Sequence, residues 1–258
     1  MNILEVRNVV KKFGGVTAVN NFSMDLKPGQ IVGIIGPNGA GKTTIFNLIS
    51  GIYPVNEGSI MLDGKDVTKF KQEEIARNGI ARTFQNIRLF KGLNVLDNVK
   101  AAFDYNARYT MLEALLRLKR VRDEEKRIEK TAWEYLKIVK LESYANEKPE
   151  NLPYGLQRRL EIARALAMSP KVLMLDEPAA GLNPEEVFGL IDFIREIKTQ
   201  FDLSLIIIEH RMDLIMQLCE WIYVQDFGEN IAQGTPAEIQ QNEKVLAAYL
   251  GGEKECLL

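Results

Sequence analysis

The chain has 258 residues, of which 46% are hydrophobic and 26% are charged, and its formal net charge is −2. This composition is that of a folded globular protein with a full core, and its slightly acidic balance argues against a general nucleic-acid binder. No apolar run approaches the ~18 residues of a membrane-spanning helix, and early charges after Met1 argue against a signal peptide. The two cysteines, Cys219 and Cys256, lack metal-binding spacing and predict free thiols in a reducing, cytosolic compartment.

The N-terminal part of the chain predicts an antiparallel sheet that leads into a buried strand. Alternating apolar residues are separated by glycine and proline turns at 14–15 and 28–29. Strands are expected at residues 3–6, 16–19, 22–26 and 58–63. The β-branched run at 31–35 is typical of a strand buried on both faces.

The nine residues after this buried strand fit the pattern G-x-x-x-x-G-K-S/T, the phosphate-binding loop. They are Gly36, Pro37, Asn38, Gly39, Ala40, Gly41, Lys42, Thr43 and Thr44. A helix is expected over 43–50, with Gly51 as its C-terminal cap. Glycines let backbone N–H groups point at a phosphate, and the helix N-terminus adds positive potential. Lys42 suits the β- and γ-phosphates and the Thr43 hydroxyl suits Mg²⁺, so the loop predicts a nucleoside triphosphate site rather than a chance glycine-rich turn.

The middle of the chain changes to helical periodicity. Residues 92–147 are rich in Leu, Ala, Lys, Arg and Glu and contain no strong strand signal. The stretch 117–130 carries more basic than acidic residues. It is interpreted as a solvated helix face, and a surface that contacts a partner is the alternative.

After Pro153 strands and helices alternate again. Asn183 followed by proline and two acids is a strong helix start, and Thr235 begins a capping box for a final helical stretch. Helices are expected at residues 155–168, 184–199 and 211–219, and strands at 172–175, 205–208, 221–227 and 230–233. This alternation predicts a mostly parallel sheet covered on both faces.

Two acids, Asp176 and Glu177, stand at the carboxyl end of a predicted buried strand, where an open α/β sheet places its ligands. Asp176 is predicted to hold Mg²⁺, and Glu177 to face the attacking water as base or orienter. The alternative is an ordinary helix-capping turn.

Together these residues resemble the ATP-binding subunits of ABC transporters over essentially the whole chain. In that family the phosphate loop is followed by a glutamine loop, a signature, an acidic strand end, a D-loop and a switch histidine. Apart from the signature, these positions are occupied in order by Gln85, by Asp176 with Glu177, by the segment 180–184 and by His210. The signature position is Leu152, Pro153, Tyr154, Gly155, Leu156 and Gln157.

The resemblance implies roles for three further residues, each with a plainer alternative. His210, the only histidine in the chain, takes the switch role beside the γ-phosphate and Glu177 rather than that of a surface or core histidine. Gln85 reaches Mg²⁺ or the water and signals to a membrane partner, rather than being an ordinary loop residue. Phe13 stacks on adenine, rather than packing under the sheet.

The chain departs from the family pattern at two motifs. Where the commonest signature reads Leu-Ser-Gly-Gly-Gln, Pro153 replaces the serine, Tyr154 the first glycine and Leu156 the glutamine. The backbone N–H groups of Tyr154, Gly155 and Leu156 are then expected to supply the anion site. In the D-loop, Asn183 stands where aspartate is usual, which is expected to alter a contact across a dimer.

The resemblance implies an α/β fold: a P-loop NTPase core of the ABC type, an N-terminal antiparallel β-subdomain and an inserted helical subdomain. The single domain 1–258 divides into a core at 1–91 and 149–258 and a helical part at 92–148. One signature and one phosphate loop imply two-fold pairing, with a second, different ATPase chain favoured over a second copy. Further implied partners are transmembrane permeases and, indirectly, a periplasmic or extracellular substrate-binding protein. The expected location is the inner face of the cell membrane.

Within the family the chain is most similar to importer ATPases for branched-chain amino acids. The segments 81–85 and 176–184 resemble theirs, and a long helical stretch is expected around 104–140. The alternatives are ATPases of lipopolysaccharide export and of urea or amide import, since cargo rests on analogy. There are three alternatives from other functional classes. They are a soluble ABC ATPase of DNA repair or translation, an unrelated phosphate-loop kinase or GTPase, and a nucleotide-regulated structural protein.

Overall fold

A computed structural model describes residues 1–103, 113, 115–116 and 118–251. The chain forms two compact units, one from residues 1–85 with the chain from Lys171 onward, and one from residues 86–170. Cys256 and part of the helical stretch expected around 104–140 lie outside the described residues.

The first unit contains a six-stranded sheet with the strand order β10-β9-β3-β8-β7-β6. Its strands are β3 (Ile31–Ile35), β6 (Ile80–Arg82), β7 (Val172–Asp176), β8 (Ser204–Ile208), β9 (Trp221–Asp226) and β10 (Glu229–Gly234). Strands β9, β3, β8, β7 and β6 pair in parallel, and β10 pairs with β9 in the antiparallel sense. Every residue of β3, β7 and β8 is buried, which confirms the prediction of a mostly parallel sheet covered on both faces.

A second, four-stranded antiparallel sheet has the order β2-β1-β4-β5. Its strands are β1 (Leu4–Phe13), β2 (Val16–Leu26), β4 (Glu57–Leu62) and β5 (Lys65–Asp66). The prediction of separate strands at 16–19 and 22–26 is wrong, because β2 is continuous. Asn21 takes a left-handed backbone conformation with φ 53°, and the pairing of β2 with β1 shifts register there, as in a β-bulge, without ending the strand.

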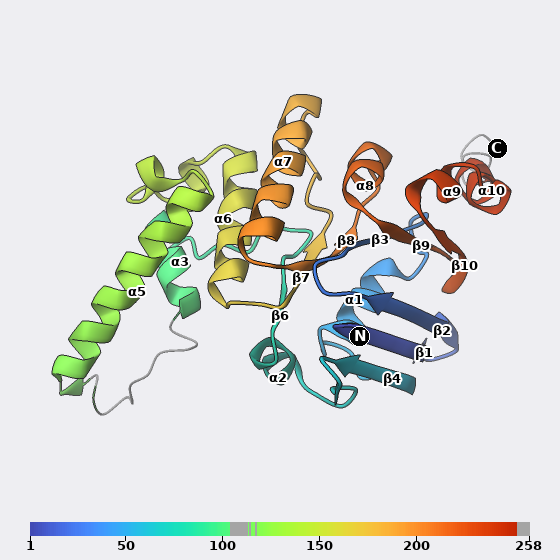
Figure 1. Ribbon diagram of the computed structural model, residues 1–258, viewed down its shortest axis with the longest axis horizontal. Coiled ribbons are helices and arrows are strands. Elements are labelled where there is room, and N and C mark those ends of the chain that lie inside the picture. The colour runs from blue at the N-terminus through green and yellow to red at the C-terminus, as the bar shows by residue number, and fades with distance from the viewer. Residues whose placement is uncertain (104–112, 114, 117, 252–258) are drawn as a thin grey trace. The chain divides into compact units, whose positions relative to one another are not determined.

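Helices cover both faces of the six-stranded sheet (Figure 1). Those of this unit are α1 (Lys42–Ile49), α2 (Gln72–Arg77), α7 (Pro184–Gln200), α8 (Met212–Leu218), α9 (Pro236–Gln240) and α10 (Glu243–Gly251). Helices α7 and α8 lie on one face, and α1 lies on the other face toward the four-stranded sheet. A continuous core joins apolar residues of β1, β2, β4 and α1 to those of β3, β7 and β8. The predicted helices after Asn183 and Thr235 are confirmed, as is the capping box at Thr235, and Asn183 forms a capping box as well.

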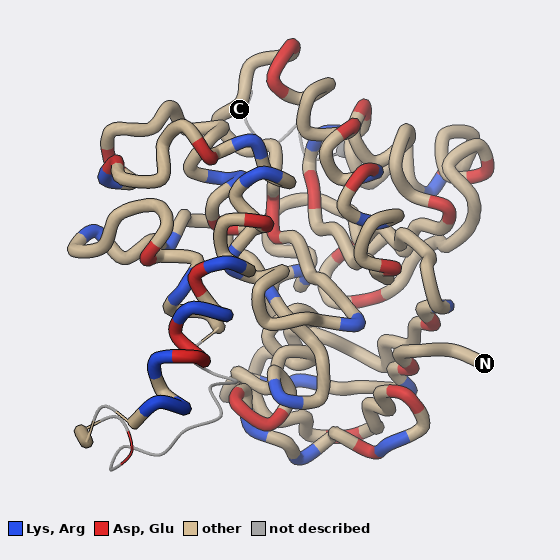
Figure 2. The backbone as a smooth tube through the Cα atoms, turned by 60° about the vertical axis from the view of Figure 1, so that its left-hand side comes forward, with Lys and Arg blue, Asp and Glu red and all other residues tan. Residues whose placement is uncertain are grey.

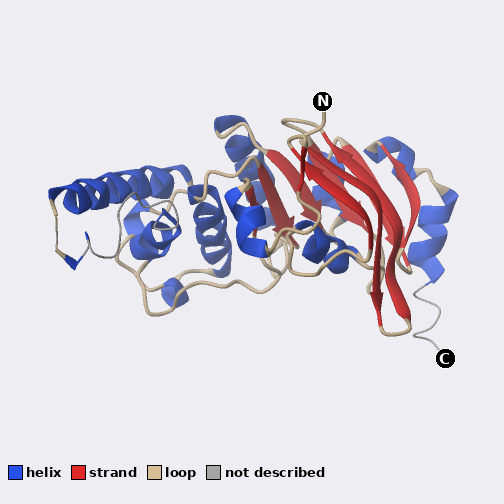
Figure 3. Cartoon of the chain, turned by 90° about the horizontal axis from the view of Figure 1, so that it is seen from below, coloured by secondary structure: helices blue, strands red, loops and turns tan. Residues whose placement is uncertain are grey.

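The described residues of the second unit are helical and contain no strand (Figure 3). The helices are α3 (Val95–Phe103), α5 (Lys119–Ile138), η2 (Glu142–Tyr144), η3 (Pro149–Asn151) and α6 (Tyr154–Ala167). Basic and acidic residues are interspersed along α5 (Figure 2), and Arg127 pairs with Glu124 at 2.6 Å. In the described part of the chain, no helix combines the length and apolar character needed to span a membrane.

Candidate nucleotide site

The carboxyl ends of neighbouring parallel strands bring the predicted catalytic residues of the first unit to one edge of the six-stranded sheet. Strands β3, β8, β7 and β6 are adjacent in that order. Asp176 at the end of β7 lies in register with Ile208 at the end of β8. The residues that follow these two strands therefore lie close together, at the edge where open parallel sheets bind ligands.

The phosphate-binding loop joins β3 to α1 and fits tightly between other strands. A Cβ atom at Gly36 would lie 2.0 Å from the carbonyl oxygen of Gln225, and one at Gly41 would lie 2.4 Å from that of Ala18. Gly41 is also the N-cap of α1, with φ 97°. Only glycine meets both demands, the close approach and the positive φ. The loop is thereby held by β2 and β9, and the first turn of α1 opens onto it.

Lys42 begins α1 and is buried against the loop. Its Nζ donates to the carbonyl oxygens of Gly36 and Pro37, both at 2.7 Å. Burial lowers the pKa of Lys42, and the carboxylates of Glu177 and Asp176 oppose that shift. The lysine cation thus lies on the loop itself, within the electrostatic influence of both strand-end acids.

Three residues predicted as separate motifs meet at Glu177. Gln85 Nε2 donates to Glu177 Oε2 at 2.9 Å, and His210 Nε2 lies 3.1 Å from Glu177 Oε1. The Glu177 N–H donates to the carbonyl of Ile208 at 2.8 Å, and its backbone takes a left-handed conformation with φ 46°. A non-glycine residue in this region is strained and is typical of functional sites. The structure therefore brings the glutamine loop, the acidic strand end and the switch histidine into one hydrogen-bonded group.

The other strand-end acid, Asp176, is ion-paired with an arginine that the sequence reasoning did not single out as a site residue. Arg82 Nη2 lies 2.6 Å from Asp176 Oδ2, and both side chains are buried. Arg82 Nη1 also donates to Asn47 and Ser50 of the α1 region, and its guanidinium lies over the ring of Phe46 at 5.2 Å. Arg82 stands in the segment 81–85 that carried the family resemblance, but its partners are distant in sequence.

Phe13, predicted to stack on adenine, stands at the end of β1 and is 43% exposed. Its ring packs edge-on against Tyr53 at a centroid distance of 5.2 Å, and Lys11 Nζ lies 5.0 Å from its centroid. The ring is therefore not packed under the sheet as the alternative proposed. Its exposure leaves it free to meet a planar ligand.

The signature residues belong to the second unit, where Pro153 is the N-cap of α6. The Leu156 N–H donates to the Pro153 carbonyl at 2.9 Å, so this N–H is already engaged within the helix. Gln157 Nε2 donates to the Leu152 carbonyl at 2.8 Å, and Tyr154 is 41% exposed. Tyr154, Gly155 and Leu156 form the first turn of α6, as expected for residues at the start of a helix, and their role as an anion site stays a prediction.

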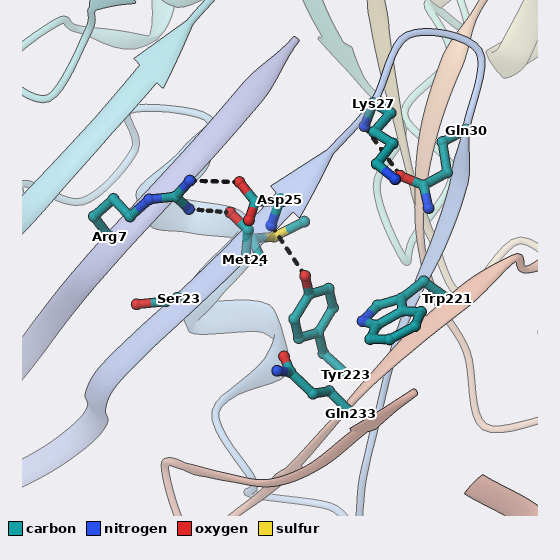
Figure 4. A pocket seen from close by; sticks show the side chains of 9 residues that line it. All are labelled: Arg7, Ser23, Met24, Asp25, Lys27, Gln30, Trp221, Tyr223 and Gln233. Carbon is teal, nitrogen blue, oxygen red and sulfur yellow. Dashed lines mark hydrogen bonds and ion pairs between the residues drawn. The ribbon is translucent and has the colours of Figure 1, made fainter. Parts of the chain in front are cut away.

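A separate hollow of about 320 Å³ is lined by residues of β1, β2, β9 and β10 and the adjoining turn (Figure 4). In its wall, Arg7 is ion-paired with Asp25 at 2.6 Å, and the Tyr223 hydroxyl accepts from the Asp25 N–H at 3.0 Å. Trp221 in its wall is in register with Val32 near the start of β3. The hollow therefore lies toward the opposite end of the strands from the phosphate-binding loop.

The predicted metal ligands form a donor set that suits Mg²⁺. Thr43, Gln85 and Asp176 offer hydroxyl, amide and carboxylate oxygens, which a hard cation prefers. Among the described residues there is no cluster of three His, Cys, Asp or Glu residues that would cage a metal.

Comparison with known proteins identifies the family. The family model described as ABC transporter matches residues 19–180, more than half of the chain. The chain belongs to the ABC transporter ATP-binding family. As a member, it is an ATP-binding ATPase subunit, and the predicted fold and family are confirmed.

Three similar proteins illustrate this membership. The high-affinity branched-chain amino acid transport ATP-binding protein LivG of Escherichia coli K12 is 41% identical over 249 residues, covering 96% of this chain and 98% of LivG. The crystal structure of the ADP conformation of an ATP-binding cassette of an ABC transporter has 33% identity and a TM-score of 0.84, covering 97% of this chain and 99% of that one. A dimeric post-hydrolysis cassette bound to ADP and phosphate has 26% identity and a TM-score of 0.76, covering 90% and 98%.

The C-terminal part of this ABC subunit carries a more specific match. Residues 229–255 match the family model described as branched-chain amino acid ATP-binding cassette transporter. The described part of this segment comprises β10, α9 and α10. The match therefore extends the likeness beyond the core that all ABC ATPases share.

Proposed function

We propose that this chain is the ATPase subunit that powers an importer of branched-chain amino acids. The observation that carries the proposal is the nearly full-length likeness to LivG, supported by the C-terminal match to the branched-chain cassette. Lipopolysaccharide export and urea or amide import rank below it, because the C-terminal match favours the branched-chain group. A soluble ABC ATPase of DNA repair or translation ranks lower still.

In the proposed reaction, the chain's own residues bind ATP and orient the water that attacks the γ-phosphate. Lys42 moves from the loop carbonyls to the β- and γ-phosphates, and the residues 36–44 surround them. Glu177 holds the water, with His210 fixing its carboxylate and contacting the γ-phosphate. Phe13 stacks on the adenine. The closeness of Gln85, Glu177 and His210 supports this assignment, because such hydrolysis depends on positioning and charge.

Mg²⁺ is the proposed metal, held by Thr43, Gln85 and Asp176. When bound, it supplies positive charge that stabilises the phosphate oxygens. Arg82 occupies Oδ2 of Asp176, which orients the carboxylate and leaves Oδ1 for the metal or its water. Gln85, which contacts Glu177 through Nε2, would reach the metal or its water and so link nucleotide binding to a neighbouring permease.

We further propose that the active assembly contains two ATPase subunits, two permeases and, on the outer side, a substrate-binding protein. The signature 152–157 of one subunit completes the phosphate site of the other, as the dimeric state of the similar cassette suggests. A different second ATPase is favoured over a second copy. Residues 92–148 are the proposed helical subdomain, and the chain is placed in the cytoplasm on the inner face of the membrane through its permeases.

A tagged pull-down of the chain from detergent-solubilised membranes of its source cells tests this function. Two polytopic permeases and a second ATPase of similar size are the expected co-purifying proteins. Recovery of lipopolysaccharide-export proteins would overturn the proposed cargo, and recovery of nucleic-acid machinery alone would overturn the transport role.

A further inference from the structure

We infer that Glu209 is a positioning residue that fixes His210 and Glu177 by tying together the loops that follow β7 and β8. The inference rests on the proposed function, in which these two side chains prepare the attacking water. In that proposed function the Glu209 carboxylate does not itself touch ATP, Mg²⁺ or the water.

The Glu209 side chain is buried and accepts three backbone hydrogen bonds. The residue is 2% exposed. Its Oε1 accepts from the Ala179 N–H at 2.7 Å, and its Oε2 accepts from the N–H groups of His210 at 2.7 Å and Arg211 at 3.1 Å. Hydrogen bonds to an ionised carboxylate are stronger than neutral ones, and three of them offset the cost of burying its charge.

The three donors belong to two loops that are far apart in sequence. Ala179 lies between the strand-end acid Glu177 and the D-loop, whereas His210 and Arg211 follow β8. Two further contacts join the same loops: the Glu177 N–H donates to the Ile208 carbonyl at 2.8 Å, and Arg211 Nη1 donates to the Leu182 carbonyl at 3.3 Å. Glu209 is the buried centre of this connection.

This connection sets the distance between the two side chains proposed for catalysis. His210 Nε2 lies 3.1 Å from Glu177 Oε1, and each side chain extends from one of the loops that Glu209 joins. A displacement of about 1 Å in such an arrangement costs about a hundredfold in rate. The chemistry therefore depends on Glu209 although its carboxylate faces the backbone.

Glu209→Gln tests the inference, with Glu220→Gln as the matched control. Glutamine keeps the shape of the side chain, but its Nε2 cannot accept a hydrogen bond, so at least one of the three backbone donors loses its partner. Glu220 likewise accepts a backbone N–H, from Ile31 at 3.4 Å, and pairs with Lys198 at 3.0 Å, away from the catalytic group.

Two readouts of the full chain distinguish positioning from mere stabilisation. The first separates kcat from the KM for ATP. The second is the imidazole NMR signal, which is unambiguous because His210 is the only histidine. Glu209→Gln is expected to lower kcat about ten- to a hundredfold, to leave ATP affinity nearly unchanged and to shift the imidazole signal. Glu220→Gln is expected to change neither.

Wild-type kcat in folded Glu209→Gln overturns the inference, as does a reduced kcat with an unshifted imidazole signal. Absence of ATP hydrolysis in the unaltered chain with its partners contradicts the proposed function instead.

If Glu209→Gln does not fold, hydrogen exchange of the unaltered chain tests the inference without a variant. The amide hydrogens of Ala179, His210 and Arg211 are expected to exchange slowly in the unaltered chain, and rapid exchange at all three contradicts the inference.

Discussion

Glu177 combines a strained backbone with a side chain held from two directions. Its left-handed conformation directs the carboxylate toward Gln85 and His210, which contact one oxygen each. The Gln85 amide and the His210 imidazole hold the Glu177 carboxylate in a fixed orientation. Such an orientation suits a group proposed to accept a hydrogen from the attacking water. Gln85 and His210 therefore hold the carboxylate that is proposed to orient the attacking water.

Glu177→Gln is expected to abolish steady-state ATP hydrolysis while ATP binding and ATP-dependent dimerisation remain. The amide keeps the size of the side chain but loses the charge that orients the water, and a loss of about a hundredfold or more is expected. Phosphate release measures the rate, and filter binding measures ATP affinity. Retained turnover contradicts the proposed role and favours a nucleotide-regulated protein in which Glu177 is structural.

Binding of ATP is expected to take up protons at alkaline pH through Lys42. Burial lowers the pKa of this amine before ATP binds, and the negative phosphates raise it again. Calorimetry over a range of alkaline pH, in two buffers of different ionisation enthalpy, measures the uptake. Lys42→Arg is the control, because its guanidinium stays protonated throughout. No uptake in the unaltered chain, or equal uptake in the variant, contradicts this account.

The sequence identified the residues that carry a motif, but not those that hold the motifs in place. Glu177, His210 and Gln85 are recognisable from local patterns, and the structure brings them together. Arg82 and Glu209 act through partners that are remote in sequence or are backbone groups. A one-dimensional pattern contains no sign of such partners until the strands are paired in register.

At the scale of elements, α7 begins at a reciprocal capping box formed by the D-loop residue Asn183. Its side chain accepts from the Glu186 N–H at 2.9 Å, and Glu186 accepts from the Asn183 N–H at 2.9 Å. The residue that departs from the usual family aspartate thus keeps the capping function, because an amide oxygen accepts as a carboxylate does.

Asn183→Ala is expected to reduce the free energy of unfolding by about 1 kcal/mol, since the first turn of α7 loses an acceptor. Urea denaturation followed by circular dichroism measures it. Asn183→Asp, which retains the cap, is the matched control and is expected to stay close to the unaltered chain. If both variants lose the same stability, the cap is not the cause.

Three short elements, α2, β5 and β6, were not predicted from the sequence. Helix α2 has six residues and one buried side chain, Ile75, while β5 and β6 have two and three residues. Segments of this length contain too few residues to establish a period, so tertiary pairing decides them. The long helices and the fully buried strands were predicted because their patterns repeat or run unbroken.

At the scale of the molecule, the fold places one phosphate loop in the first unit and one signature in the second. The order of the sheet was not predicted, because β3 pairs with β8 and β9, which are remote from it along the chain. The family resemblance implied the class of fold without a strand order. A single copy of each motif is what leads to the proposal of a paired assembly with composite sites.

ATP-dependent uptake of labelled leucine is the direct test of transport powered by this subunit. Membrane vesicles that contain the assembled transporter, with ATP on the side of this chain, are compared with vesicles that carry Glu177→Gln. Leucine uptake is expected to fall when isoleucine or valine competes, to be unaffected by urea and to be abolished in the variant. Uptake of urea instead of leucine, or leucine uptake that survives Glu177→Gln, would contradict the proposed function.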